Sequence, residues 1–230
     1  MKTLGLIGGM SWESTVPYYR IVNERVRVRL GGLHSAKLVL HSVDFAEIEA
    51  LQRADDWDAA GALLAEAARG LRAAGADALV LCTNTMHLVA PAIEVAVDIP
   101  LLHIADATAQ CIRAAGISRV GLLGSRFTME RPFYRERLEA AGIEVSTPEA
   151  TQRERVDRVI FEELCLGRIL EASREDYLGI IADLVARGAQ GVVLGCTEIG
   201  LLVGEGDASV PLFDTARIHA EAAADWALAE

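Results

Sequence analysis

The chain contains two copies of one pattern of short segments. Three pairs of segments match in the same order, at offsets of 113 to 116 residues: 4–9 with 120–125 (LGLIGG and VGLLGS), 17–20 with 132–135 (PYYR and PFYR), and 75–81 with 188–194 (GADALVL and GAQGVVL). A single short match would carry little weight, whereas three ordered matches at nearly one offset indicate a repeated structural unit. The sequence therefore predicts two similar halves.

Short apolar runs alternate with longer amphipathic segments along the chain. The apolar runs predict buried strands at residues 4–7, 37–41, 78–81, 101–104, 120–123, 191–194 and 210–213. Segments with apolar residues at helical spacing predict helices at 14–30, 45–74, 105–115, 130–141, 153–166, 174–187 and 215–228. Four helices are followed by a glycine suited to a left-handed cap: Gly75, Gly116, Gly142 and Gly188. The alternation predicts an α/β fold with mostly parallel sheets flanked by helices.

The repeat also predicts where the chain divides. We expect an N-terminal α/β domain of residues 1–104 plus 212–230, in which the last helix returns to the first half. Residues 105–211 are expected to form a C-terminal α/β domain. Ligands of parallel α/β sheets bind at the carboxyl ends of the strands. We therefore expect the active site in the cleft between the two domains.

Composition excludes several classes of function. The chain has 22 Lys and Arg residues against 33 Asp and Glu residues, a formal net charge of −11, and no basic stripe that would neutralise nucleic-acid phosphates. No window holds the ~18 consecutive apolar residues of a membrane helix, so we expect a cytoplasmic protein that binds neither nucleic acid nor membrane. The four cysteines lack the short spacing of metal sites, and the glycines after the first strand lack the dinucleotide pattern. No metal or nucleotide is therefore expected.

The ends of two apolar strands carry the candidate chemistry. In the gapless third match, Thr83 is the counterpart of Cys196. Two such side chains at pseudo-equivalent positions suit the removal of a proton from one face of a carbon and its delivery to the other face. A thiol has a free pKa of ~8.5, which a helix N-terminus can lower toward neutrality. A threonine hydroxyl is far less acidic, so Thr83 would need a relay or a charged neighbour.

A cysteine after a strand also has a structural interpretation, because free cysteines often serve as small buried hydrophobes. Here both strand-end motifs surround the reactive position with small polar residues. Burying such residues without a ligand would be costly. The pattern favours a functional Cys196 and leaves both interpretations open for Cys82.

Three motifs make the chain resemble a known family. GGMSWEST at residues 8–15, CTNTMH at 82–87 and LGCTEI at 194–199 are similar to motifs of the cofactor-independent aspartate/glutamate racemases, and the resemblance spans essentially all 230 residues. It implies two Rossmann-like domains related by a pseudo-twofold axis, with the substrate in the cleft between them. It also implies a homodimer and racemisation of amino acids without pyridoxal phosphate (PLP), metal or nucleotide.

One departure from the family pattern concerns the first wall of this cleft. The family usually has Cys-Asn-Thr there, whereas here Thr83 precedes Asn84 and Thr85, and Cys82 lies one residue earlier. A subgroup similar to this chain, with members that favour L-amino acids, has the same Thr and Cys pair. The resemblance therefore implies an asymmetric enzyme, in which Cys196 and Thr83 act as catalytic residues on opposite faces of the α-carbon. The enantiomer deprotonated on the Thr83 side is then expected to react slowly.

The resemblance also implies which residues bind the substrate. Contacts to the α-carboxylate are expected from loop amides and from Met10, Asn84, Thr85 and Thr197, with Ser125 and Thr128 of the second half as further candidates. Glu198 is a candidate to orient or deprotonate Cys196, and an exposed carboxylate at a helix start is the alternative. Cys82 is a second candidate for an orienting role. His87, four residues after Thr83, is either on the same face as Thr83 or a structural histidine.

Recognition of the substrate side chain is less constrained. Aspartate racemases that resemble this chain distantly use basic residues for the second carboxylate, and the segment at 163–166 (ELCL) has no lysine. Gln52 and Arg53 are the nearest polar candidates in the first half. If Gln52 faces the pocket, a neutral polar side chain such as that of homoserine is accepted as well as a carboxylate.

These observations predict a PLP-independent amino-acid racemase of the aspartate/glutamate type, with an amino acid as its small-molecule substrate. Two alternatives remain. One is a decarboxylase or isomerase of the same superfamily that works with a single thiol. The other is a non-catalytic amino-acid-binding protein, in which the threonine at position 83 reflects the loss of catalytic activity.

Overall fold

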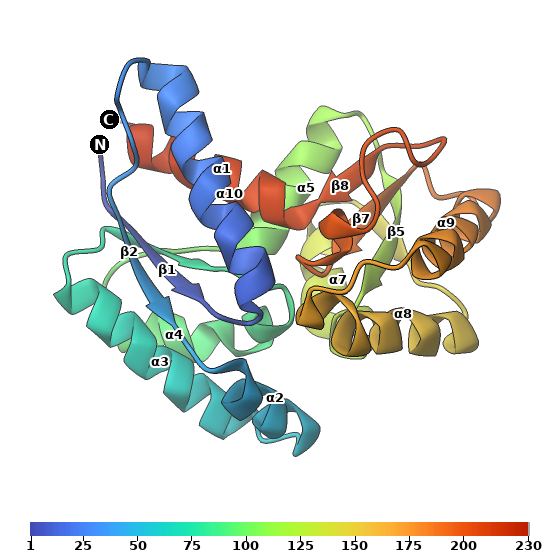
Figure 1. Cartoon of the computed structure of the whole chain (residues 1–230), viewed down its shortest axis with the longest axis horizontal. Coiled ribbons are helices and arrows are strands. Elements are labelled where there is room, and N and C mark those ends of the chain that lie inside the picture. Colours follow the sequence, from blue (N-terminus) through green and yellow to red (C-terminus); the bar gives the residue numbers. More distant parts are fainter. Residues whose placement is uncertain (230) are drawn as a thin grey trace. The chain divides into compact units, whose positions relative to one another are not determined.

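The computed structural model describes residues 1–229, which form two compact units. One unit contains residues 1–103 and the chain from 219 onward, and the other contains residues 104–218. Within the described residues, each unit has a four-stranded parallel sheet with helices on both faces (Figure 1). The predicted α/β fold with two parallel-sheet halves is confirmed.

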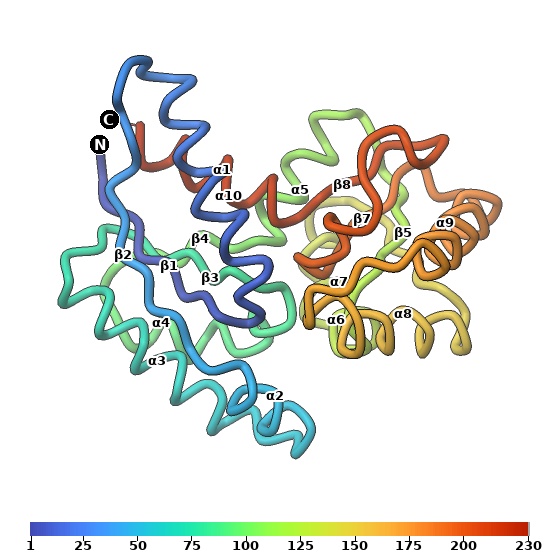
Figure 2. The backbone as a smooth tube through the Cα atoms, in the orientation of Figure 1, coloured from blue at the N-terminus to red at the C-terminus, as the bar shows by residue number. Residues whose placement is uncertain are grey.

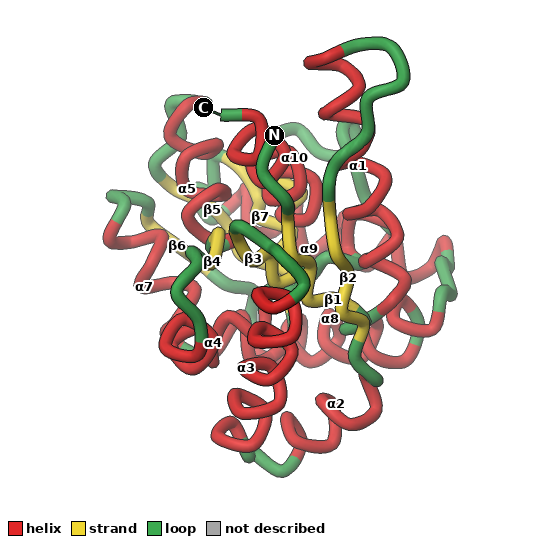
Figure 3. Tube along the Cα trace, turned by 90° about the vertical axis from the view of Figure 1, so that its left-hand side faces the viewer, coloured by secondary structure: helices red, strands yellow, loops and turns green. Residues whose placement is uncertain are grey.

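The first sheet has the strand order β2-β1-β3-β4. Its strands are β1 (Leu4–Gly8), β2 (Leu38–Ser42), β3 (Ala78–Leu81) and β4 (Leu101–Leu102). The flanking helices are α1 (Trp12–Leu30), α2 (Phe45–Arg53), α3 (Trp57–Ala73), the 3-10 helix η1 (Thr85–Val89), α4 (Ala90–Ala96) and α10 (Thr215–Leu228). Helices α1 and α10 lie on one face, and α3 and α4 on the other (Figures 1 and 3). Because helices cover both faces, the central strands β1 and β3 are buried along their whole length.

The second sheet has the equivalent order, β6-β5-β7-β8. Its strands are β5 (Arg119–Gly124), β6 (Glu144–Ser146), β7 (Gly191–Gly195) and β8 (Leu212–Asp214). The flanking helices are α5 (Ile104–Ala114), α6 (Arg126–Glu130), α7 (Pro132–Ala140), α8 (Ala150–Glu162), η2 (Leu164–Leu166), α9 (Glu171–Ala186) and η3 (Ile199–Leu201). Each strand of the second sheet therefore has a counterpart at the same position in the first, as the internal repeat predicts.

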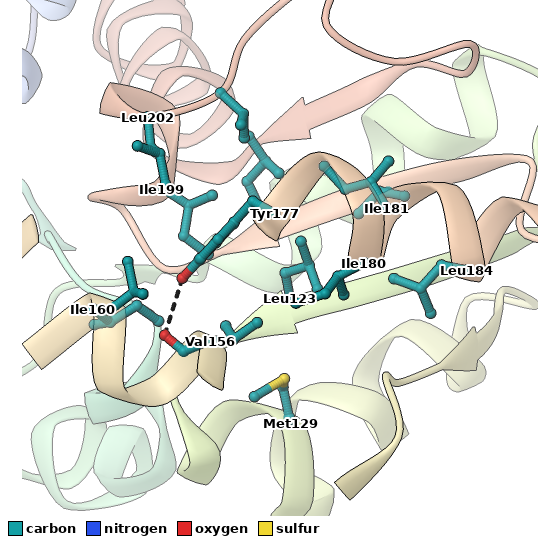
Figure 4. Close-up of a cluster of buried hydrophobic side chains, with 14 of the residues drawn as sticks. Leu123, Met129, Val156, Ile160, Tyr177, Ile180, Ile181, Leu184, Ile199 and Leu202 are labelled. Atoms are coloured by element: carbon teal, nitrogen blue, oxygen red, sulfur yellow. Dashed lines mark hydrogen bonds between the residues drawn. The ribbon is translucent and has the colours of Figure 1, made fainter. Parts of the chain in front are cut away.

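A dense apolar core fills the space between the second sheet and helices α8 and α9 (Figure 4). Leu123 of β5 packs there in one cluster with Val156 of α8 and Tyr177 of α9. Tyr177 is fully buried, and its hydroxyl donates a hydrogen bond to the carbonyl oxygen of Val156 at 3.0 Å. A phenol without that partner would be costly to bury. This bond therefore joins the two helices that support the end of β7.

The chain returns to the first unit at a later residue than predicted. We placed the return to the N-terminal domain at residue 212, but β8 pairs with β7 and the second unit extends to Ile218. From His219 onward, α10 packs on the first unit. The main-chain N–H of Lys2 donates to Ala227 O at 2.9 Å, which brings the two ends of the chain together (Figure 2).

The helix after the last strand of each sheet belongs to the other unit. Helix α5 follows β4 of the first sheet but lies in the second unit, and α10 follows β8 of the second sheet but from His219 lies in the first. Each unit has a buried tyrosine that binds this exchanged helix. The Tyr18 hydroxyl lies 2.9 Å from His219 Nδ1, and the Tyr134 hydroxyl donates to Thr108 Oγ1 at 3.4 Å.

Several details of the secondary structure differ from the prediction, among them helix α4, which was not predicted. Strand β6 was not predicted because it has only three residues and none of them is fully buried. The predicted helix at 45–74 is two helices, since Asp55 takes a left-handed conformation with φ 56°. The predicted helix at 130–141 begins instead with α6 and is divided before Pro132. The four predicted glycine caps are confirmed, each with a positive φ between 71° and 100°. Within residues 1–229, no helix is both long enough and apolar enough to cross a membrane.

Candidate active site

The first group of candidate residues lies where β3 ends. Cys82, Thr83 and Asn84 connect β3 to η1, and all three are buried. The Thr83 main-chain N–H donates to Leu81 O at 2.9 Å, and the carbonyl oxygen of Thr83 lies 2.7 Å from His87 Nδ1. The histidine therefore contacts the main chain of Thr83. The sequence left two interpretations of His87 open: a residue on the same face as Thr83 or a structural histidine. In the structure, the His87 ring binds a main-chain carbonyl.

Cys82 is a buried thiol directed into the first unit. Its side chain is fully buried, and its Sγ lies 3.6 Å from the carbonyl oxygen of Val80. Burial raises the pKa of the Cys82 thiol well above its usual value, because an apolar environment disfavours the thiolate. The position favours the structural interpretation of Cys82, as a small hydrophobe beneath the Thr83 turn.

The loop after β1 is adjacent to the Thr83 turn, because β1 and β3 are paired and Ile7 is in register with Leu81. Met10 in this loop is buried and packs in the apolar core of the first unit. The loop is held by Thr15, a residue that the sequence did not single out. The Thr15 hydroxyl accepts from the Gly9 N–H at 2.9 Å and donates to Ser11 O at 2.9 Å.

Gln52 is buried on α2, with 4% of its surface exposed. Its Nε2 donates to the thioether sulfur of Met86 at 3.0 Å. Its Oε1 is buried without a hydrogen-bond partner among the described residues. Arg53, the other predicted candidate, is exposed and pairs with Glu49. Gln52 is therefore the candidate with an unused acceptor.

The second group of candidate residues lies where β7 ends. Cys196 follows the strand directly, and its Sγ donates a hydrogen bond to Glu198 Oε2 at 3.0 Å. The Thr197 hydroxyl donates to the same oxygen at 2.9 Å. Glu198 has only 2% of its surface exposed, so the alternative of an exposed carboxylate at a helix start is wrong. The structure assigns Glu198 to the immediate surroundings of the thiol.

The environment of Cys196 favours the protonated thiol. Burial raises the pKa of Cys196 well above its usual value, and the negative charge of the neighbouring Glu198 raises it further. The expectation that a helix N-terminus would lower this pKa is wrong, because only the three-residue η3 follows Cys196. Cys196 therefore needs a proton acceptor before it can act as a base, and Glu198 is the acceptor within reach.

The loop after β5 is adjacent to the Cys196 turn, since Gly124 and Gly195 are paired at the ends of neighbouring strands. Ser125 and Thr128 are buried there, and Ser125 Oγ accepts from the Thr128 main-chain N–H at 3.3 Å. A Cβ on Gly124 would lie 3.0 Å from the Thr128 Cβ, so the glycine allows this threonine to pack on the strand end. In each unit, the predicted residues apart from those on helix α2 thus lie at the carboxyl ends of the two central strands.

The donor set of the described residues also bears on cofactors. Among residues 1–229, no group of three or more His, Cys, Asp or Glu side chains is arranged to hold a metal ion. The titratable groups near the strand ends include the Cys196 thiol and the Glu198 carboxyl group in the second unit, and the His87 ring in the first. These groups suit proton transfer at a carbon.

Comparison with known proteins relates the chain to racemases and their homologues. The family model for Asp/Glu/Hydantoin racemases matches residues 7–223. The chain is similar over its whole length, and over all of each solved chain, to a Yersinia pestis protein of the Asp/Glu racemase type (62% identity, TM-score 0.92) and to an aspartate racemase homologue from Pyrococcus horikoshii (36% identity, TM-score 0.86). The Picrophilus torridus aspartate racemase shares the fold, with 19% identity, a TM-score of 0.79, and 99% and 94% of the two chains covered. The resemblance indicated by the three motifs is confirmed, and the chain belongs to the Asp/Glu/Hydantoin racemase family.

Proposed function

We propose that the protein is a PLP-independent amino-acid racemase of the aspartate/glutamate type, in which Cys196 and Thr83 exchange protons with opposite faces of the α-carbon. The observation that carries the proposal is the 3.0 Å contact between Cys196 Sγ and Glu198 Oε2, at the end of the strand equivalent to the one before Thr83. A thiol beside a buried proton acceptor suits general acid–base catalysis. Membership of the racemase family supports the reaction class.

The proposed reaction begins at Cys196. Glu198 takes the thiol proton, and the thiolate removes the α-proton of the amino acid, so that the C–H bond breaks and an S–H bond forms. The electron pair left on the α-carbon spreads into the substrate carboxylate, where donors of Asn84 and Thr85 stabilise it. The Thr83 hydroxyl then donates its proton to the opposite face of the carbon. Water returns a proton to the Thr83 oxygen, and Glu198 releases the thiol proton to the hydroxide that remains, so both side chains regain their starting states.

The two directions of this reaction differ in their microscopic steps. Removal of the α-proton by Thr83 requires an alkoxide, which is a far rarer species than a thiolate, so that step is slow. The two enantiomers have equal free energies in solution, so the equilibrium constant is unity and kcat/KM is equal in both directions. The asymmetry therefore appears in kcat and KM separately, and in the exchange of the α-proton with solvent.

Glu198→Gln is expected to raise the reactivity of the resting thiol while lowering turnover. The negative charge of Glu198 raises the pKa of Cys196, so its removal lowers that pKa, although burial keeps it above the usual value. Alkylation of Cys196 by iodoacetamide, followed by mass spectrometry across pH, should begin at lower pH in the variant. The loss of the proton acceptor should lower kcat by about 10²-fold.

Exposed Glu205 of the same unit provides the matched control, Glu205→Gln, which should change neither measurement. If Glu198→Gln lowers both the alkylation rate of Cys196 and kcat, the assigned role is contradicted. A carboxylate with only a structural role would affect both rates in the same direction.

Gln52 is proposed to select substrates whose side chain donates a hydrogen bond. A buried acceptor without a donor costs about 1–3 kcal/mol, and the hydroxyl of homoserine could supply the donor. Gln52→Met should lower kcat/KM for homoserine by about tenfold and change that for aspartate less, while the free energy of unfolding stays equal or rises. Steady-state kinetics and urea unfolding test both statements. A loss confined to aspartate in Arg53→Met would assign side-chain recognition to Arg53 instead.

The racemase proposal itself is tested by proton NMR in D2O, without added cofactor. The purified protein is incubated separately with the L- and D-enantiomers of aspartate, glutamate and homoserine. Loss of the α-proton signal together with inversion supports the proposal. No exchange with any of the six amino acids would contradict it.

A one-thiol decarboxylase is the second candidate, and the protonated state of Cys196 favours it. An acid positioned to protonate one face of a carbanion would suffice after loss of CO2, with no task for Thr83. Release of CO2 from malonate-type acids, without racemisation of any amino acid, would support this function.

A further inference from the structure

Three buried histidines lie together beside the turn that carries Thr83. The centroid of the His87 ring lies 4.3 Å from that of His103 and 6.0 Å from that of His219. The three residues have 2%, 7% and 1% of their surface exposed, respectively. They come from separate segments of the first unit: η1, the end of β4 and helix α10. Their closest contact with the candidate site is the 2.7 Å distance from His87 Nδ1 to Thr83 O.

Hydrogen bonds define the orientation of these rings. A carbonyl oxygen only accepts, so His87 Nδ1 carries the hydrogen donated to Thr83 O, and His219 Nε2 carries the hydrogen donated to Leu102 O at 2.7 Å. The Tyr18 hydroxyl donates to His219 Nδ1 at 2.9 Å. Burial lowers the pKa of His219 to about 4, so this ring is neutral at neutral pH. His87 thus packs against a neutral ring that is fixed on both nitrogens.

The internal repeat provides a comparison within the same chain. Residues 104–218 contain no histidine. The gapless match pairs His87 with Gly200, and the register of the equivalent strands β4 and β8 pairs His103 with Asp214. The histidine cluster is therefore not part of the repeated fold. It belongs only to the half that carries threonine in place of the catalytic thiol.

The two halves also differ in the bond to the carbonyl of the reactive residue. In the second unit, the Cys196 carbonyl accepts the main-chain N–H of Ile199 at 3.0 Å. In the first unit, the main-chain N–H of His87 donates to Asn84 O at 3.1 Å, and the imidazole of His87 donates to Thr83 O. The carbonyl oxygen of Thr83 therefore accepts its hydrogen bond from a side chain, whereas that of Cys196 accepts from the main chain. Without the imidazole, a buried carbonyl would lose its donor.

We propose that His87 is a positioning residue for Thr83, held in place by His103 and His219. The bond to the Thr83 carbonyl fixes the turn after β3, and thereby the direction in which the Thr83 hydroxyl presents its proton. A hydroxyl is a weak acid, so its proton transfer depends strongly on correct placement, and a displacement of ~1 Å can lower a rate by about 10²-fold. This inference rests on the proposed function, since it assigns a role relative to Thr83.

The test compares His87→Leu, which removes the donor, with His87→Asn, which keeps a side-chain N–H close to the position of Nδ1. We expect His87→Leu to lower the kcat of racemisation by about 10- to 100-fold with little change in KM. Solvent exchange of the α-proton with retention of configuration, which needs only Cys196, should stay close to the unmodified rate. His87→Asn should restore racemisation, and His34→Asn on the exposed surface should have no effect.

A second measurement does not depend on turnover. Hydrogen–deuterium exchange should show faster exchange of the amides at residues 83–89 in His87→Leu, and slower exchange again in His87→Asn. If the unmodified protein neither exchanges nor inverts any amino acid, the proposed function fails, and amide exchange still tests the bond. The positioning role is overturned if amide exchange is unchanged in His87→Leu, if His87→Asn behaves like His87→Leu, or if racemisation and α-proton exchange fall together.

Discussion

Cys196→Ala abolishes both racemisation and α-proton exchange in the proposed mechanism, with an expected loss of about 10²- to 10⁴-fold in kcat. The thiol is the only group described at the end of β7 that can hold the α-proton, and the adjacent Glu198 is already engaged by Cys196 and Thr197. Proton NMR in D2O measures exchange and polarimetry measures inversion. Both signals should vanish for both enantiomers. Inversion in either direction passes through this sulfur, and exchange by Thr83 alone would require its rare alkoxide.

Cys111→Ala is the matched control, since this cysteine is also partly buried in the second unit and lies on α5. It should keep full activity. Cys196→Ala should remain folded, as judged by circular dichroism, because the change removes one partly buried sulfur atom. Racemisation at the unmodified rate in Cys196→Ala would eliminate the thiol mechanism outright.

Thr83→Val is expected to separate the two activities that Cys196→Ala removes together. Valine has nearly the shape of threonine but no hydroxyl, so the carbanion formed by Cys196 loses its proton donor on the other face. Inversion should fall by about 10²- to 10⁴-fold. Exchange of the α-proton should continue for the enantiomer whose proton faces Cys196, because the thiol can exchange its proton with solvent and return it to the same face.

Thr83→Ser retains the hydroxyl and should keep most of the inversion activity, which makes it the control for changes in packing. The comparison of deuterium incorporation with optical rotation in one sample gives both rates at once. Equal inversion rates for Thr83→Val and Thr83→Ser would show that the hydroxyl has no role, and would transfer the second acid to another group.

The sequence was sufficient for the architecture because the architecture is repeated. Strands β1, β3 and β4 each have a predicted counterpart in the second sheet, and the gapless match correctly places Thr83 and Cys196 at equivalent strand ends. Strand β6 was not predicted because its three residues form no continuous apolar run. The division between α2 and α3 escaped because the left-handed Asp55 interrupts a helical periodicity that continues on both sides.

The environment of the candidate site was harder to predict from sequence. The spacing of Cys196 and Glu198 fits either an exposed helix-start carboxylate or a buried partner of the thiol, and only burial distinguishes the two. The role of Thr15 was not predicted, because its loop differs in length from the equivalent loop that carries Thr128. The repeat therefore does not align the two threonines. Side-chain contacts between distant segments, such as those of His219, leave no mark in local periodicity.

The exchange of α5 and α10 means that no single cut divides this protein into two independent domains. A fragment ending at His103 would lack α10, the helix whose Asp225 forms an ion pair with Arg25 at 2.7 Å and whose His219 binds Tyr18. The rest of the chain would carry α10 as an amphipathic helix without its own sheet to cover. The single polypeptide thus has the connectivity of a helix-swapped pair, in which the covalent link supplies each helix at a high effective concentration.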